Sequence, residues 1–199
     1  MKHLKKLSEE ILHENPWWTY KHEQFEKANG ETGDYYYAKT SGMSIIIPVL
    51  SDGRIVLVRQ YRYLFDKESI EFPGGGIKQD ASALHTAKKE LFEETGWVGD
   101  EFAKIGEFQP ANGYAKDNAH VYLARVLEQK EQKLDDTEEI EVIYRRPDEI
   151  DEMVRRNDIW DGMSLAAWSL VRGIFFKELT GTESPTLQNI FKSFFDTST

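Results

Sequence analysis

The stretch GGIKQDASALHTAKKELFEETGW, residues 75–97, decides how this chain folds and where its chemistry lies. Residues 82–95 have the composition and spacing of a helix. Asp80 or Ser82 can cap its first turn, and Gly96 can end it in a left-handed conformation. The stretch therefore predicts one helix that follows a glycine-rich loop.

Three carboxylates lie on one face of this helix. Glu90, Glu93 and Glu94 are neighbours there, because side chains three and four residues apart meet on a helix surface. The adjacent apolar face, predicted to pack on a sheet, consists of Leu84, Ala87 and Leu91. Clustered carboxylates repel one another unless a cation compensates them, and such oxygen ligands suit Mg²⁺ or Mn²⁺. The alternative is a solvated acidic face, which an acidic protein commonly has.

The loop before the helix can bring its backbone close to a ligand. Between Pro73 and Ile77 the chain is glycine only, so no side chain stands in the way. A carbonyl oxygen of this loop can therefore complete the shell of a metal ion bound by the helix.

The same stretch resembles the Nudix box, whose pattern is Gly, five residues, Glu, seven residues, Arg-Glu, an aliphatic, any residue, Glu-Glu, any residue and Gly. The positions that match are Gly75, Glu90, Leu91, Glu93, Glu94 and Gly96. Ala81 replaces the first Glu of the pattern, and Lys89 replaces the Arg that orients the Glu after it. Lysine keeps the charge but lacks the planar fork of arginine. The resemblance implies metal-dependent hydrolysis of a pyrophosphate bond.

Further segments resemble the ADP-ribose pyrophosphatase and nucleotide-sugar branch of that family. They are residues 58–62 and 69–75 before the box, 135–142 after it, and 159–162 near the last helices. Together with the box they cover roughly residues 17–178. The resemblance implies that ADP-ribose or a nucleotide sugar is cleaved to a nucleoside monophosphate and a sugar phosphate. It also implies Mg²⁺ as cofactor, for which Mn²⁺ can substitute.

The resemblance assigns metal ligands residue by residue. Glu90 and Glu94 correspond to direct ligands, and the Gly74 carbonyl to a further one. Glu93 corresponds to a ligand or to a partner of the ligands. The metal would neutralise the diphosphate as charge builds and lower the pKa of a bound water.

The general base is expected in the loop before the last core strand. In this branch a carboxylate there often activates water or completes the metal shell. Asp136 and Glu138 match best, with Glu139 as a fallback, so the predicted catalytic residues are Glu138, Asp136 and Glu90, and Glu138 is also a predicted metal ligand. A flexible acidic loop is the alternative interpretation of this run.

The predicted substrate-binding residues are Arg62, Arg59, Glu71, Trp17, Trp18 and Asp117. The two arginines can bind phosphates through bidentate hydrogen bonds, or form structural salt bridges. Glu71 can line the pocket or pair with an arginine. Trp17 and Trp18 can stack a nucleobase, although aromatic residues at this density are more often core or interface. Asp117 lies in a loop, residues 112–118, that can reach the substrate.

The order of elements predicts an α+β fold, an α/β/α sandwich with a mixed sheet and a small N-terminal β segment. Residues 1–40 are predicted as a helix, over 4–13, followed by a β-hairpin, and residues 41–199 as the hydrolase domain. A last helix is expected near 186–195. Large apolar groups in residues 17–40 exceed what a small hairpin can bury, which predicts a homodimer formed through this segment.

Composition excludes several classes of function. The formal charge of the 199 residues is −10, with 35 acidic and 25 basic side chains, which argues against a nucleic-acid partner. The chain has no cysteine, so disulfides and thiol nucleophiles are excluded. We expect a cytoplasmic protein without a membrane partner, because neither a signal peptide nor a long apolar run is present. Its partner is expected to be a small nucleotide conjugate.

Two other functions fit the same motif. The departures at Ala81 and Lys89 leave open a catalytically weak domain that binds a nucleotide conjugate as a sensor. The second alternative is hydrolysis of a different substrate, capped RNA or a nucleoside triphosphate. The negative charge of the protein disfavours long RNA.

Overall fold

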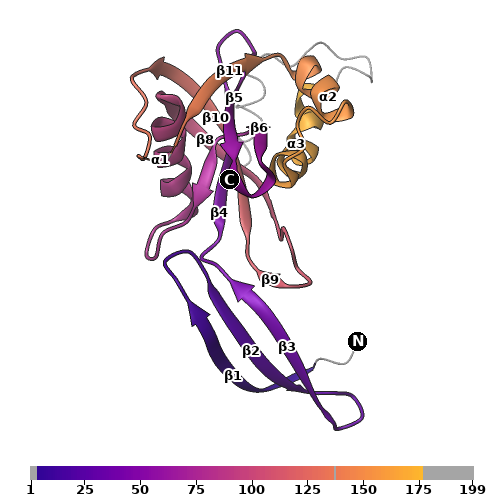
Figure 1. Cartoon of the computed structure of the whole chain (residues 1–199). Coiled ribbons are helices and arrows are strands. Elements are labelled where there is room, and N and C mark those ends of the chain that lie inside the picture. The colour runs from indigo at the N-terminus through magenta and orange to yellow at the C-terminus, as the bar shows by residue number, and fades with distance from the viewer. Residues whose placement is uncertain (1–3, 137, 177–199) are drawn as a thin grey trace, which may run out of the picture.

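A computed structural model describes residues 4–136 and 138–176 of the chain. Figure 1 shows a long, narrow N-terminal sheet joined to a layered body. The strands are β1 (Lys5–Glu14), β2 (Thr19–Glu26), β3 (Thr32–Lys39), β4 (Met43–Val49), β5 (Ile55–Arg62), β6 (Lys67–Glu71), β7 (Gly74–Gly76), β8 (Trp97–Phe108), β9 (Ala115–Lys116), β10 (Ala119–Gln129) and β11 (Ile140–Arg145). The helices are the 3-10 turn η1 (Tyr63–Phe65), α1 (Ala83–Thr95), α2 (Pro147–Arg155) and α3 (Gly162–Phe175).

The body is built on a mixed sheet with the strand order β11-β5-β4-β10-β8. β4 and β10 run parallel, and the other neighbours on this path are antiparallel. The short strands β6 and β7 pair with β5 and β4. β4 is apolar along nearly its whole length and buried on both faces, as is the first half of β5, which is the pattern expected of central strands.

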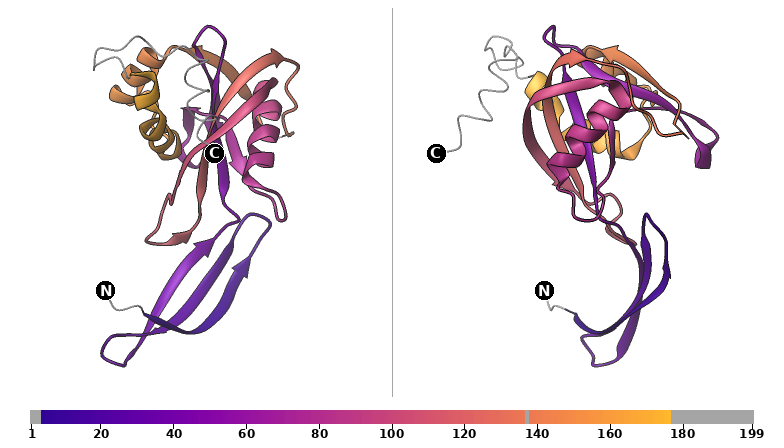
Figure 2. Two further views of the ribbon diagram at one scale, coloured as in Figure 1. Left: turned by 180° about the vertical axis from the view of Figure 1, so that it is seen from behind. Right: turned by 90° about the vertical axis from the view of Figure 1, so that its left-hand side faces the viewer.

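Helices cover both faces of this sheet. α1 packs on one face, where Ile46, Val56 and Leu91 share a buried cluster. α2 and α3 pack on the other, where Ile150 and Trp168 meet the remaining side chains of β4 and β5. Figures 1 and 2 show α1 on one side of the strands and α2 with α3 on the other. The predicted α+β sandwich with a mixed sheet is confirmed.

The N-terminal sheet has the order β1-β2-β3-β9. Its last strand, β9, lies in the loop between β8 and β10 and pairs parallel to the end of β3. This short pairing and the direct passage from β3 to β4 connect the sheet to the body, as the two views in Figure 2 show. The small N-terminal β segment expected from the sequence is therefore a distinct sheet.

The predicted helix over residues 4–13 is wrong: this segment is the strand β1. Its pairing with β2 is antiparallel and contains two irregularities, between Lys6 and Ser8 and between Ile11 and His13. Leu7 and Leu12 fall at these irregularities, so the alternation of a regular strand is broken and the apolar residues keep a helix-like spacing. Ion pairs across the strands, such as Lys6–Glu23 at 2.7 Å, stabilise the pairing.

Other details refine the expected elements. Ala87 and Leu91 are fully buried beneath α1, but Leu84, predicted on the same face, is 37% exposed. It lies in the first turn of α1, where the apolar face does not yet reach the sheet. The expected helix near 186–195 falls outside the described residues. Among the helices of the described part, none has the length and apolar character that crossing a bilayer requires.

Candidate active site

The helix α1 is fixed at both ends by side-chain and backbone capping. Ser82 Oγ accepts a hydrogen bond from the His85 N–H at 3.1 Å, and Gly96 takes a left-handed conformation with φ of 71°. Between these caps, Ala87 and Leu91 anchor the helix on the sheet. The caps and the buried seam together set the direction in which the glutamates of the last two turns point.

The glycine strand β7 lies directly against these glutamates. A Cβ added to Gly74 would stand 2.3 Å from the Ser44 carbonyl oxygen of β4. A Cβ added to Gly75 would stand 2.7 Å from Cδ of Glu90, whereas one added to Gly76 would meet nothing within 4 Å. At Gly74 a side chain would clash with the sheet backbone. At Gly75 a side chain would displace the Glu90 carboxylate.

Glu94 is the most buried carboxylate of the group, with 5% of its surface exposed. Its Oε2 accepts a hydrogen bond from the Gly74 N–H at 2.9 Å. Burial raises the pKa of Glu94 to about 8, and the charges of Glu90, Glu138 and Glu71 add to the rise, while the Gly74 N–H opposes it. The structure thus places a carboxylate where its negative charge is poorly compensated.

Glu90 is in a similar position, closer to solvent. Burial raises the pKa of Glu90 above its usual value, Lys89 counteracts the rise, and the charges of Glu93 and Glu138 contribute to it. The Lys89 ammonium forms an ion pair with Glu93 and lies 3.5 Å from a Glu90 oxygen. Lys89 therefore lies beside Glu90, the glutamate that follows it, and pairs with Glu93.

The donor set fits a divalent cation by its chemistry. Glu90, Glu94 and Glu138 influence one another electrostatically. Their oxygens are the ligands that Mg²⁺ and Mn²⁺ prefer. In the residues described here, no three carboxylate or imidazole groups are already gathered as a metal-binding cluster. The fit rests on the burial and the mutual repulsion of these carboxylates. The Lys89 ammonium lies beside Glu90 and offsets only part of that repulsion.

The loop before β11 brings one of the predicted bases to this group. Glu138 is partly buried and accepts a hydrogen bond from the Asp135 N–H at 3.0 Å. It lines a cavity of about 450 Å³ together with Arg59 and Glu141. Asp136 is exposed, and Glu138, not Asp136, is among the main charges that raise the pKa values of Glu90 and Glu94. Of the two predicted bases, Glu138 has the better location.

Both predicted phosphate-binding arginines are engaged in ion pairs. Arg62 binds Glu71 with two guanidinium nitrogens, Nε at 2.7 Å from Oε1, and Glu71 is buried. Arg59 pairs with Glu141 across the β5–β11 pairing, with Nε 2.9 Å from Oε2. Glu71 thus pairs with an arginine, one of the two possibilities that the sequence left open.

The remaining predicted substrate residues lie away from the glutamates. Trp17 and Trp18 occupy the exposed turn between β1 and β2, and Trp18 packs against His13. Asp117 accepts hydrogen bonds from the Thr40 hydroxyl at 2.5 Å and from the Asn118 N–H at 2.8 Å. Within the described residues, the partners of these side chains lie in β1, at the end of β3 and in the loop before β10, and none belongs to α1.

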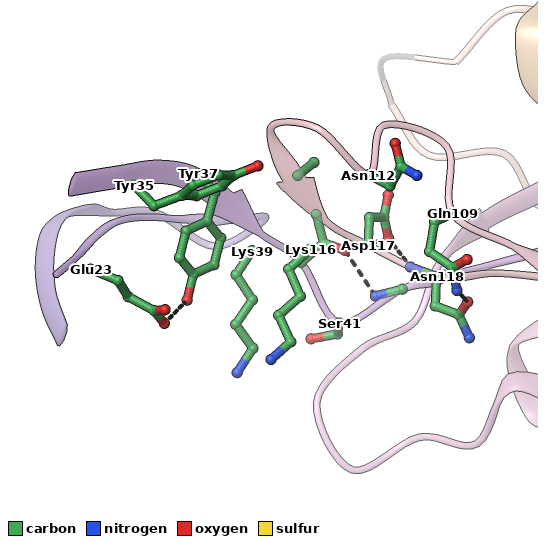
Figure 3. Close-up of a pocket in the computed structure, with 13 residues that line it drawn as sticks. Glu23, Tyr35, Tyr37, Lys39, Ser41, Gln109, Asn112, Lys116, Asp117 and Asn118 are labelled. Atoms are coloured by element: carbon green, nitrogen blue, oxygen red, sulfur yellow. Dashed lines mark hydrogen bonds between the residues drawn. The ribbon is translucent and has the colours of Figure 1, made fainter. Parts of the chain in front are cut away.

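Asp117 lines a second cavity, of about 610 Å³, between the N-terminal sheet and the loop 109–118 (Figure 3). The other polar groups in its wall include Lys39, Ser41, Gln109 and Lys116. Sequence reasoning found Asp117 but not the residues of β3 beside it. These residues come together through the parallel pairing of β3 with β9. That pairing spans only two residues, so it leaves no periodic pattern in the sequence.

Comparisons with known proteins agree with this geometry. The family model of the NUDIX domain matches residues 40–166. The chain is 29% identical to an ADP-ribose pyrophosphatase of Bacillus subtilis (strain 168), covering 73% of this chain and 80% of that one. It is also 29% identical to a methanol dehydrogenase activator of Bacillus methanolicus, over 71% and 78% of the two chains. A crystal structure of an ADP compounds hydrolase superposes with a TM-score of 0.78 at 20% identity, covering 91% of this chain and 97% of that one.

Proposed function

The chain belongs to the Nudix hydrolase family, and on this premise we propose that it hydrolyses the pyrophosphate bond of a nucleoside diphosphate conjugate. ADP-ribose or a nucleotide sugar is the proposed substrate, and the products are a nucleoside monophosphate and a sugar phosphate. The similarity of the chain to the ADP-ribose pyrophosphatase of Bacillus subtilis supports this choice. The observation that carries the proposal is the pair Glu90 and Glu94, whose pKa values burial raises, against the Gly74–Gly76 strand.

Glu90, Glu94 and the Gly74 carbonyl are the proposed ligands of a divalent cation, Mg²⁺ with Mn²⁺ as a substitute. Glu93 is a further proposed ligand or a partner of the ligands, and its ion pair with Lys89 favours the second role. When bound, the cation would neutralise the diphosphate and make a bound water more acidic. The chain itself supplies a shielded, rigid frame, since Glu94 is held by the Gly74 N–H.

Glu138 is the proposed general base. It is close enough to the glutamates of α1 to raise the pKa values of both Glu90 and Glu94. It also lies in a loop next to Arg59, in one cavity wall. A base must lie within hydrogen-bonding reach of the water that it deprotonates, and Glu138 meets that condition better than the exposed Asp136. Arg59 and Arg62 are proposed to contact the diphosphate from this side.

The alternative function, a catalytically weak sensor of nucleotide conjugates, rests only on Ala81 and Lys89. Ala81 lies outside the carboxylate group, in the loop before α1. Lys89 keeps its contact with Glu93 and lies near Glu90. Neither departure removes a proposed ligand, so hydrolysis is the better-supported function.

Hydrolysis is tested with a panel of nucleotide conjugates and product identification by mass. ADP-ribose, nucleotide sugars, a nucleoside triphosphate and a capped RNA are incubated with Mg²⁺, with Mn²⁺ and with excess chelator. We expect a nucleoside monophosphate and a sugar phosphate from at least one diphosphate conjugate, and no turnover with chelator. Binding without turnover across the panel would favour the sensor, and full activity in chelator would contradict the metal site.

Residues 1–40 are proposed as the dimerisation segment, and residues 41–199 as the hydrolase domain. Every residue of β1 is exposed. Tyr20 and Tyr36 stack on one face of the N-terminal sheet and are both exposed, as are the tryptophans of the neighbouring turn. A narrow sheet cannot bury so many large apolar groups by itself. A second copy that presents the same face would cover them in a two-fold dimer.

The dimer is tested by light scattering at micromolar concentration. We expect a mass near twice 23.1 kDa for the intact protein, and a shift toward the monomer for Tyr36→Glu, because a charge would enter the apolar interface. Tyr63→Glu is the matched control, since Tyr63 is 83% exposed and lies in η1, outside the N-terminal sheet. A monomer mass for the intact protein would end the dimer model.

A further inference from the structure

Two lysines meet side by side in the 610 Å³ cavity between the N-terminal sheet and the body. Lys39 of β3 is the register partner of Lys116 of β9. Figure 3 shows that both side chains extend in the same direction, on the side where Ser41 also lies. Paired strands are about 4.8 Å apart, and like charges placed directly opposite each other repel. Both lysines are exposed, so their repulsion is modest, and their two ammonium groups form a local site for an anion on this side of the cavity.

The cavity wall also contains two carboxylates, Glu23 and Asp117, but neither forms an ion pair with these two lysines. In residues 4–136 and 138–176, no ion pair is recorded for Lys39 or for Lys116. The acidic side chains of the cavity wall have other partners. Glu23 binds the Lys6 ammonium at 2.7 Å and the Tyr37 hydroxyl at 2.6 Å. Asp117 accepts its hydrogen bonds from Thr40 and Asn118.

The remainder of the wall suits a polyhydroxylated ligand. Gln109 and Asn118 present side-chain amides and hydrogen bond to each other at 2.9 Å. Tyr35 and Tyr37 add ring surfaces, and the Tyr35 hydroxyl donates to the Gly113 carbonyl at 2.6 Å. A concave site with aromatic faces and a few fixed amides binds a sugar better than a purely apolar molecule.

The cavity is connected to the proposed hydrolytic site through the start of β4. Gly42 lines it, and Ser44, two residues further along β4, pairs with Gly75. Gly75 in turn lies against the Glu90 carboxylate. Two strand residues span about 7 Å, comparable with the width of one sugar unit. A conjugate whose diphosphate is held near Glu90 can therefore place its far end in this cavity.

We propose that the cavity selects substrates that carry a compact anionic group, a carboxylate or a phosphate, on the sugar end of the conjugate. Lys39 and Lys116 bind this group, and the amides beside them bind the sugar. The inference rests on the proposed pyrophosphatase function and specifies its substrate class. It assigns to the two lysines a role in specificity and none in bond cleavage.

The test compares two conjugates that differ only in this charge, UDP-glucose and UDP-glucuronic acid. Because both contain the same nucleotide, the contribution of the base cancels in their ratio. Affinities are measured by calorimetry in excess chelator, where nothing is hydrolysed, and kcat/KM is measured separately with Mg²⁺. The proteins are wild type, Lys39→Met/Lys116→Met, and the charge-matched control Lys104→Met/Lys130→Met, whose lysines pair with Glu107 and Glu128 elsewhere.

We expect wild type and control to bind the sugar acid about fivefold more tightly than the neutral sugar, in line with two exposed ion contacts. The lysine double variant should bind both conjugates with a ratio near one. No preference in wild type, or a preference that survives the double variant, overturns the inference. Lysine-dependent binding of inorganic phosphate without any preference between the conjugates also overturns it. In that case the two lysines bind a free anion and not the charged end of a conjugate.

The two readouts separate this inference from the proposed function. Hydrolysis of both conjugates at equal efficiency, with equal affinities, upholds the pyrophosphatase and removes the anion subsite. Lysine-dependent preference in the calorimetry, without hydrolysis of any conjugate, upholds the subsite and contradicts the proposed hydrolytic function.

Discussion

Glu94→Gln should lower turnover of the best conjugate by about 10³-fold at saturating Mg²⁺. Glu94 is the most buried of the proposed ligands, and glutamine has the same shape without the charge. The amide oxygen of glutamine can still accept the hydrogen bond from the Gly74 N–H. The loss should therefore appear in kcat, with little change in the far-ultraviolet circular dichroism.

The matched control for this variant is Glu128→Gln, on β10. Its side chain is 63% exposed and pairs with Lys130 at 3.2 Å, so the substitution removes an equal charge from an exposed side chain that is not a proposed ligand. Activity of this control should stay close to that of wild type. If Glu94→Gln also keeps activity within a few-fold of wild type, Glu94 is not a metal ligand.

Stability provides a second readout of the same substitution, in excess chelator. An unfolded glutamate ionises near pH 4.5, whereas burial holds the pKa of Glu94 at about 8 in the folded protein. Between these values only the folded state keeps the proton, so the metal-free protein loses stability as pH rises through this window. Glu94→Gln removes that contribution. The Tm of the variant relative to wild type should therefore increase from about pH 5 to about pH 8.

How much of this site the sequence predicts depends on the range of each interaction. The helix α1 and its three glutamates follow from local periodicity and from caps, because a helix is specified by neighbours within a few residues. The glycines before it follow from the absence of side chains. The family resemblance extended the interpretation to Glu138, which the sequence alone places in an acidic loop without any sign of its neighbours.

Features made by distant parts of the chain could not be predicted in the same way. The strand β1 was misassigned, because two register irregularities hide its alternation and its partner lies in β2. The ion pair Arg62–Glu71 joins two antiparallel strands and was one of two open possibilities. The pairing of Lys39 with Lys116 depends on a two-residue strand within a long loop. None of these contacts leaves a periodic signal.

Gly75→Ala should lower kcat by about 10²-fold, the usual effect of displacing a catalytic group by about 1 Å. The new Cβ would stand 2.7 Å from Cδ of Glu90, so the carboxylate must move. The side chain can give way more easily than backbone. Stability should therefore fall only moderately, by about 1–3 kcal/mol. Turnover and Tm are measured on the same preparation.

The neighbouring glycines make this a test with internal controls. At Gly74 the added Cβ would lie 2.3 Å from the Ser44 carbonyl oxygen, which the sheet holds in place, so Gly74→Ala should lower Tm far more than Gly75→Ala. At Gly76 the methyl group meets nothing within 4 Å, so Gly76→Ala should change neither activity nor stability appreciably. Gly75→Ala should therefore lose turnover with a much smaller loss of Tm than Gly74→Ala, whereas Gly76→Ala should lose neither. If Gly75→Ala resembles Gly76→Ala in turnover, the Glu90 carboxylate does not need its place against β7, and its role as a ligand is contradicted.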